Sequence, residues 1–143
     1  MVNRPALSAT LALLLGLAAL GCDKPADRIV GTWRIDLEAT LADDRQTLEL
    51  GPEERARRLE QARKFMGEMT FEFTRAGLMI ARVADTPKTE GTYTVIKSDG
   101  DTIVIEARRA TGDREKVEQL TITFDGDRLR VTDRQQSMVL TRL

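Results

Sequence analysis

The sequence predicts a mainly β protein, an antiparallel eight-stranded up-and-down barrel with one amphipathic helix between its first and second strands. Three observations support this fold class. Short segments alternate apolar and polar residues, turn signals separate these segments at regular intervals, and one segment changes to the period of a helix. Strands that each have one apolar face lose their exposed edges most simply by closing into a barrel.

The first predicted strand covers residues 29–37. Its apolar or small residues all fall on one side, namely Ile29, Gly31, Trp33, Ile35 and Leu37. This period of two is typical of a half-buried strand. The polar stretch 38–50 that follows has no firm pattern, so we expect no regular element there.

The amphipathic helix is predicted to begin at Gly51-Pro52-Glu53-Glu54. Proline suits the first helical position, and acidic side chains favour the positive end of the helix dipole. The apolar residues that follow step by three or four and form one stripe, made of Leu59, Ala62, Met66 and Met69. We expect a helix of about four turns that packs through this stripe.

Seven further strands are expected after the helix, at residues 71–74, 78–83, 92–97, 102–108, 119–124, 128–132 and 137–143. Glycine-containing turns separate several of them and predict hairpins that follow one another along the chain. Two of these turns, Asp99-Gly100-Asp101 and Asp125-Gly126-Asp127, also offer oxygen atoms that calcium can bind. Neither continues into a full ligand loop, so we interpret both as hairpin turns.

The N-terminus has the pattern of a secretory signal. A short basic start precedes the apolar stretch 6–20, and small residues follow it. This stretch is shorter than the roughly twenty residues that span a bilayer. We therefore predict three segments: a helical signal peptide at 1–21, a modified cysteine with a short tether at 22–28, and a barrel domain at 29–143.

Residues Ala19-Leu20-Gly21-Cys22 resemble the lipobox of bacterial lipoproteins, although the family usually has leucine where this chain has Ala19. The resemblance implies cleavage between Gly21 and Cys22 and acylation of Cys22, with palmitate among the added chains. Cys22 is the single cysteine of the chain. We therefore expect a lipid-anchored protein of the bacterial cell envelope that faces the periplasm. Asp23 resembles an inner-membrane retention signal, but that rule varies between phyla, so the choice between inner and outer membrane stays open.

Gly31-Thr32-Trp33 resembles the Gly-X-Trp signature in the first strand of lipocalins and their calycin relatives. The resemblance implies a barrel in which Trp33 closes one end beneath an arginine from a late strand. Arg142 is the best candidate by position, and Arg130 is the second. The chain departs from true lipocalins because its helix follows the first strand, a placement closer to the helical lid of fatty-acid-binding proteins.

Composition argues against several classes of function. The chain has no histidine, and its single cysteine is assigned to the lipid, which leaves no histidine-based nucleophile machinery and no ordinary zinc ligands. Its acidic residues lie in turns or alternate with arginine along polar faces. We therefore expect no enzyme activity, no metal and no other cofactor. The near balance of 22 basic and 23 acidic residues argues against a nucleic-acid partner.

The function expected is that of a membrane-anchored binding module with a small apolar ligand inside the barrel. The residues expected to line the ligand are Leu78 or Met79, Tyr93, Ile105, Ile122 and Leu129. The alternative is an envelope protein-protein interaction or a structural lipoprotein, with a filled barrel and no ligand. A cavity of at least about 300 Å³ favours the first hypothesis, and an exposed apolar patch favours the second.

Overall fold

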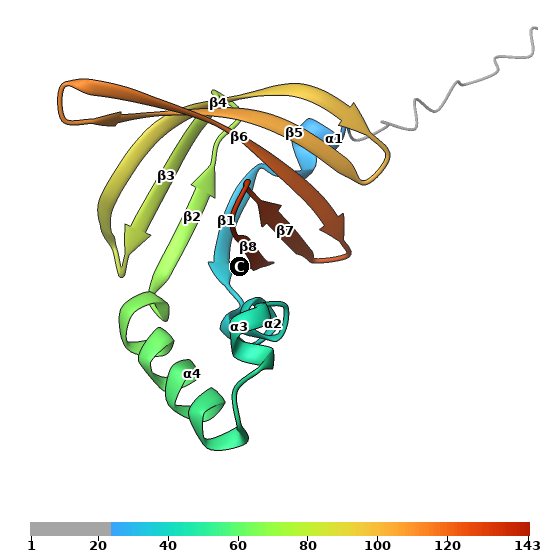
Figure 1. The fold of residues 1–143 in the computed structure, drawn as a ribbon. Helices are drawn as coiled ribbons and strands as arrows, with labels where there is room; N and C mark the ends of the chain where they lie inside the picture. The colour runs from blue at the N-terminus through green and yellow to red at the C-terminus, as the bar shows by residue number, and fades with distance from the viewer. Residues whose placement is uncertain (1–23) are drawn as a thin grey trace, which may run out of the picture.

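The computed structural model describes residues 24–143. The predicted signal peptide, the cleavage site at Gly21 and the acylation site at Cys22 lie outside the described residues. Eight strands form a closed antiparallel barrel in chain order, which confirms the predicted fold class (Figure 1). The strands are β1 (Gly31–Ile35), β2 (Met69–Phe73), β3 (Leu78–Val83), β4 (Thr86–Asp99), β5 (Thr102–Thr111), β6 (Arg114–Asp125), β7 (Arg128–Thr132) and β8 (Ser137–Arg142).

Four helices accompany these strands within residues 24–143: α1 (Pro25–Arg28), α2 (Leu37–Ala42), α3 (Arg45–Leu48) and α4 (Pro52–Met66). The helix α4 is the predicted amphipathic helix. It packs against the barrel core through Leu59, Ala62 and Met66, which belong to the predicted stripe. No helix in this part of the chain has both the length and the apolar character that a membrane crossing requires.

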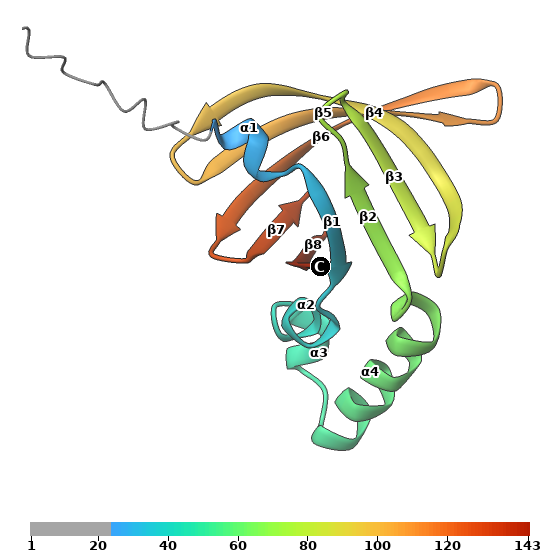
Figure 2. The same cartoon turned by 180° about the vertical axis from the view of Figure 1, so that it is seen from behind.

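The last strand closes the barrel against the first. Trp33 lies opposite Arg142 and Ile35 opposite Leu140 in the ladder between β1 and β8. All other pairings join strands that are consecutive in the chain. Because each turn reverses the chain, the hairpin turns alternate between two ends of the barrel. One end carries α1, and the other carries α2, α3 and α4 (Figures 1 and 2). We call these the closed end and the helical end.

The segment around the first strand differs from its prediction. The strand runs only from Gly31 to Ile35, and residues 37–48 contain two short helices instead of an irregular stretch. Asp36 ends the strand because its carboxylate accepts a hydrogen bond from the Ala39 N–H at 3.0 Å and so caps α2. Asp44 caps α3 in the same manner. The apolar alternation of the sequence extends to Leu37, but Leu37 is the first residue of α2 and is buried as part of that helix, not of the strand.

The segment before the first strand also has structure of its own. Residues 25–28, predicted as part of a tether, form the helical turn α1. Arg28 in this turn pairs with Asp101 at 2.6 Å and lies over the ring of Phe124, with 4.4 Å from its guanidinium carbon to the ring centroid. Ile29, which follows, is fully buried. Arg28 and Ile29 therefore fix the chain to the closed end.

The hairpin of β5 and β6 is longer than predicted and projects past its neighbours (Figure 1). The expected strands ended where apolar alternation ended, but the ladder continues to the pair Thr111 and Arg114. Cross-strand ion pairs lie along this extension, for example the pair of Arg108 and Glu115 at 3.5 Å. The ladder between β6 and β7 begins only at the pair Thr121 and Thr132. The first half of β6 is therefore paired with β5 but not with β7.

Candidate functional site

Trp33 plugs the closed end of the barrel. Its side chain is 1% exposed, and its indole N–H donates a hydrogen bond to the Ile29 carbonyl at 2.8 Å. The guanidinium of Arg142 lies over the indole, 4.3 Å from the ring centroid. Arg142 also donates hydrogen bonds to the carbonyls of Val30 at 3.0 Å and Arg28 at 2.6 Å. One cationic side chain thus covers the tryptophan and holds the chain segment that precedes β1.

Gly31 makes room for this arrangement. Its φ is 140°, and a Cβ at this position would lie 2.7 Å from a terminal nitrogen of Arg142. A larger residue would therefore both strain the backbone and displace the arginine. Arg130, the second candidate for this role, instead forms an ion pair with Asp43. Of the two arginines, only Arg142 lies over Trp33.

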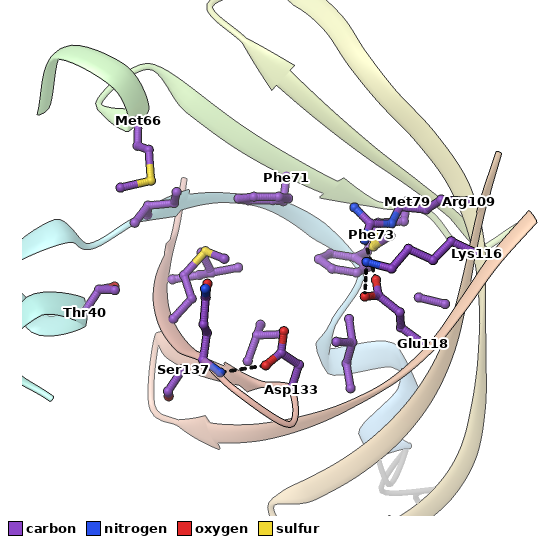
Figure 3. A pocket seen from close by; sticks show the side chains of 17 residues that line it. Thr40, Met66, Phe71, Phe73, Met79, Arg109, Lys116, Glu118, Asp133 and Ser137 are labelled. Atoms are coloured by element: carbon purple, nitrogen blue, oxygen red, sulfur yellow. Dashed lines mark hydrogen bonds and ion pairs between the residues drawn. The ribbon is translucent and has the colours of Figure 1, made fainter. Parts of the chain in front are cut away.

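A cavity of about 380 Å³ lies between the barrel strands and the helical end (Figure 3). Most of its lining is apolar, and it includes three methionine side chains and two phenylalanine rings. The apolar or weakly polar lining residues are Ile35, Thr40, Met66, Phe71, Phe73, Met79, Ala107, Leu120, Val131, Met138 and Leu140. The barrel therefore has a filled layer at the closed end and an open layer beside the helices.

Except for Met79, the residues predicted to line a ligand lie outside the cavity. Ile105, Ile122 and Leu129 are fully buried, and none of them lines the cavity. Tyr93 does not line it either, since its ring packs edge-on against Phe73 and its hydroxyl donates a hydrogen bond to the Thr74 carbonyl at 2.7 Å. Of the pair Leu78 and Met79, it is Met79 that reaches the cavity. The expected lining is therefore displaced by one layer along the barrel axis, because strand alternation identifies a face but not a depth.

Three charged side chains from the β5–β6 hairpin complete one side of the cavity (Figure 3). Glu118 accepts a hydrogen bond from Arg109 on one carboxylate oxygen, and its other oxygen forms an ion pair with Lys116 at 2.6 Å. We call Arg109, Lys116 and Glu118 the charged triad. The hydrogen bond from Lys116, followed by the contact with Arg109, holds the pKa of Glu118 below its ordinary value despite partial burial. The carboxylate is therefore ionised at neutral pH, and the triad carries one net positive charge.

The inward position of the triad follows from the strand register. Ile105 lies opposite Leu120, Ala107 opposite Glu118, and Arg109 opposite Lys116. Because side chains alternate between faces, these pairs share the inner face of the hairpin. The inner face of the hairpin therefore changes from apolar to charged toward the hairpin tip.

Gly91 on the neighbouring strand lets the backbone approach the arginine of the triad. A Cβ at this position would lie 2.4 Å from the Arg108 carbonyl oxygen and 2.9 Å from Cγ of Arg109. Gly91 is also the partner of Arg109 in the β4–β5 ladder. The stem of Arg109 is thus held against β4 by a close contact that only glycine permits.

A fourth charged residue, Asp133, lines the cavity from the turn between β7 and β8. One of its carboxylate oxygens accepts hydrogen bonds from the backbone N–H groups of Gln135 and Gln136, each at 2.6 Å. These two bonds lower the pKa of Asp133. The positive charge of Lys116 lowers the pKa of Asp133 further, so Asp133 lies within the electrostatic reach of the charged triad, although among the described residues it forms no ion pair with it.

Fold and site together define a class, a closed eight-stranded antiparallel barrel with a largely apolar cavity beside its helices and a charged triad at the cavity wall. Within residues 24–143, no three acidic or other ligating side chains are grouped so that they could hold a metal ion. Comparison with protein-family models, with curated proteins and with solved structures finds no match.

Proposed function

We propose that this chain is a membrane-anchored lipoprotein of the bacterial cell envelope whose lipocalin-like barrel binds a small apolar ligand without catalysing a reaction. The observation that carries the proposal is the cavity of about 380 Å³, largely apolar in its lining, in a barrel that is otherwise filled. Its volume falls in the range of about 300–1,000 Å³ in which small molecules bind to proteins.

The chemistry of the lining supports a ligand with hydrocarbon character. Side chains around an unfilled space lack contacts on one side, so an apolar molecule that enters gains dispersion contacts with them. Met66, Met79 and Met138 are unbranched and adjust to different ligand shapes. The rings of Phe71 and Phe73 add flat apolar surface. We therefore propose a ligand with an alkyl chain or an aliphatic ring.

The proposed anchor and the cavity belong to opposite ends of the barrel. The described chain begins beside α1 at the closed end, and the cavity lies beside α2 and α4 at the helical end (Figures 1 and 2). Acylation of Cys22 would therefore hold the closed end near the lipid. In this orientation the cavity faces away from the membrane that carries the anchor, and its ligand exchanges on the periplasmic side.

Titration with dodecan-1-ol tests the proposed binding. The full chain, carried in phosphatidylcholine nanodiscs and labelled with carbon-13 at the methionine methyl groups, gives one NMR signal for each methionine. We expect saturable shifts at Met66, Met79 and Met138, which line the cavity. Met69 does not line the cavity and serves as the internal reference. Equal, non-saturating drift of all methyl signals would contradict the proposal, because it indicates partition into lipid only.

One observation favours the alternative of a protein partner. The ring of Phe65 on α4 is 77% exposed, and an exposed aromatic side chain is a common anchor in protein interfaces. The basic residues of α4 support this alternative less, since Arg58 pairs with Asp44 and Arg63 with Glu38 on the neighbouring helices. These pairs hold the helices together, so the same side chains are only partly available to a partner or to lipid headgroups.

A further inference from the structure

The charged triad has more hydrogen-bond donors than its single carboxylate can accept. A guanidinium offers five N–H donors and an ammonium three. Within residues 24–143, the side chains of Arg109 and Lys116 each have one partner, and that partner is Glu118 in both cases. Glu118 in turn uses one oxygen for each cation. The remaining donors border the cavity without a protein acceptor among the described residues.

The triad also carries an excess of positive charge. Within the triad, two cations face one carboxylate. Asp133, the other acid of the lining, accepts hydrogen bonds from the N–H groups of its own turn and interacts with Lys116 through its charge, but it accepts none of the free donors of the triad among the described residues. A group with one negative charge and several oxygen acceptors would neutralise the triad and satisfy its donors. A neutral group with oxygen acceptors would satisfy donors but leave the charge in place, and a cationic group would add to the charge.

The triad lies where apolar lining meets water. Lys116 and Glu118 also border a polar groove of about 690 Å³ between β6 and the turn at residues 133–136. This groove exists because the first half of β6 has no pairing with β7. A molecule with its chain against Phe73 and Leu120 would place its other end beside the triad, at the entrance to the groove.

We infer that the ligand is a single-chain amphiphile with a monoanionic oxyacid head group, and that Arg109 and Lys116 bind this head group beside Glu118. The inference rests on the proposed function, because it assigns a ligand class to the same cavity. The head group is shared between the two cations, and the alkyl chain fills the layer that the methionines and phenylalanines line. The groove beside β6 is the route by which the head group remains in contact with water.

Three probes with one chain length test the head group: dodecanoate, dodecan-1-ol and dodecyltrimethylammonium. Each is titrated into the full chain in phosphatidylcholine nanodiscs and followed at the methyl signals of Met66, Met79 and Met138. Hydrogen bonds to charged groups contribute about 1.5–3 kcal/mol. We therefore expect dodecanoate to bind at least about tenfold more tightly than dodecan-1-ol, a conversion that follows from about 1.4 kcal/mol per factor of ten.

Variants assign the effect to the triad. Arg109→Gln and Lys116→Gln are each expected to weaken dodecanoate binding about tenfold while leaving dodecan-1-ol binding within about twofold. Arg108→Gln is the matched control, since Arg108 lies on the outer face and pairs with Glu106 and Glu115. Glu118→Gln removes the competing anion and is expected to strengthen dodecanoate binding several-fold. A folding defect cannot produce that gain.

The outcomes distinguish a failure of the inferred head group from a failure of the proposed ligand binding. Equal affinity for all three probes, or tighter binding of the cation, would overturn the anionic head group and leave an apolar ligand site in place. Unchanged dodecanoate affinity in both Arg109→Gln and Lys116→Gln would overturn the role of the triad. Absence of saturable shifts with every probe would overturn the proposed function itself, and the inference with it.

Discussion

Replacing Trp33 with alanine is expected to lower the free energy of unfolding by about 3–5 kcal/mol. The indole is 1% exposed, and its removal leaves a cavity at the closed end. The change also leaves the Ile29 carbonyl without its donor and Arg142 without the ring beneath it. Because Trp33 is the only tryptophan of the chain, urea unfolding is followed by circular dichroism rather than fluorescence.

Phe65→Ala is the control for this experiment. It removes an aromatic ring of comparable character from a site that is 77% exposed, so we expect a change within about 0.5 kcal/mol. A loss below about 1 kcal/mol in Trp33→Ala would contradict the account, because it would mean that the closed end does not depend on the tryptophan plug. Equal losses in the two variants would contradict it as well.

Replacing Leu120 with tryptophan is expected to abolish saturable binding of dodecan-1-ol and of dodecanoate. Leu120 is partly buried on the inner face of β6 and lines the cavity beside the charged triad. The larger ring would occupy the space in which we place the alkyl chain. Overpacking costs about 1–3 kcal/mol of stability, so urea unfolding of the variant must still show a cooperative transition. The methyl signals of Met66, Met79 and Met138 measure the loss of binding.

Thr121→Trp is the matched control, one residue along the same strand. Thr121 is exposed on the outer face, where a ring adds surface without filling the barrel. We expect wild-type affinity for both probes in this variant. If Leu120→Trp folds and still binds either probe with wild-type affinity, the ligand lies outside the cavity that we describe.

The strand pattern predicted most of the barrel because its physical cause is local. Each apolar face must be buried, and turns that contain Gly77, Gly100, Gly112 and Gly126 reverse the chain between consecutive strands. The extension of β5 and β6 was missed because its inner face carries Arg109, Lys116 and Glu118 instead of apolar residues. The helices after β1 were missed although both caps, Asp36 and Asp44, were present in the sequence. Alternation that continued across Asp36 concealed the first of them.

The candidate site was less predictable because the position of a residue along the barrel axis decides whether it lines the cavity. Tyr93, Ile105, Ile122 and Leu129 share the inner face, and the period of two gives no indication that they lie outside the cavity. The charged triad has a signal that sequence reasoning did not use. Counting by two from Ile105 through Ala107 reaches Arg109, so its inward position follows from the same alternation that predicted the strand.

The central claim is that the cavity holds a small apolar or amphipathic molecule. The most direct test is native mass spectrometry of the full chain, extracted into nanodiscs from the envelope of its own host so that a natural ligand remains bound. We predict a reproducible additional mass that is lost on denaturation and is absent from Leu120→Trp but present in Thr121→Trp. A wild-type protein that carries only the mass of its own chain and anchor, and that also fails to take up added dodecanoate, would contradict the account.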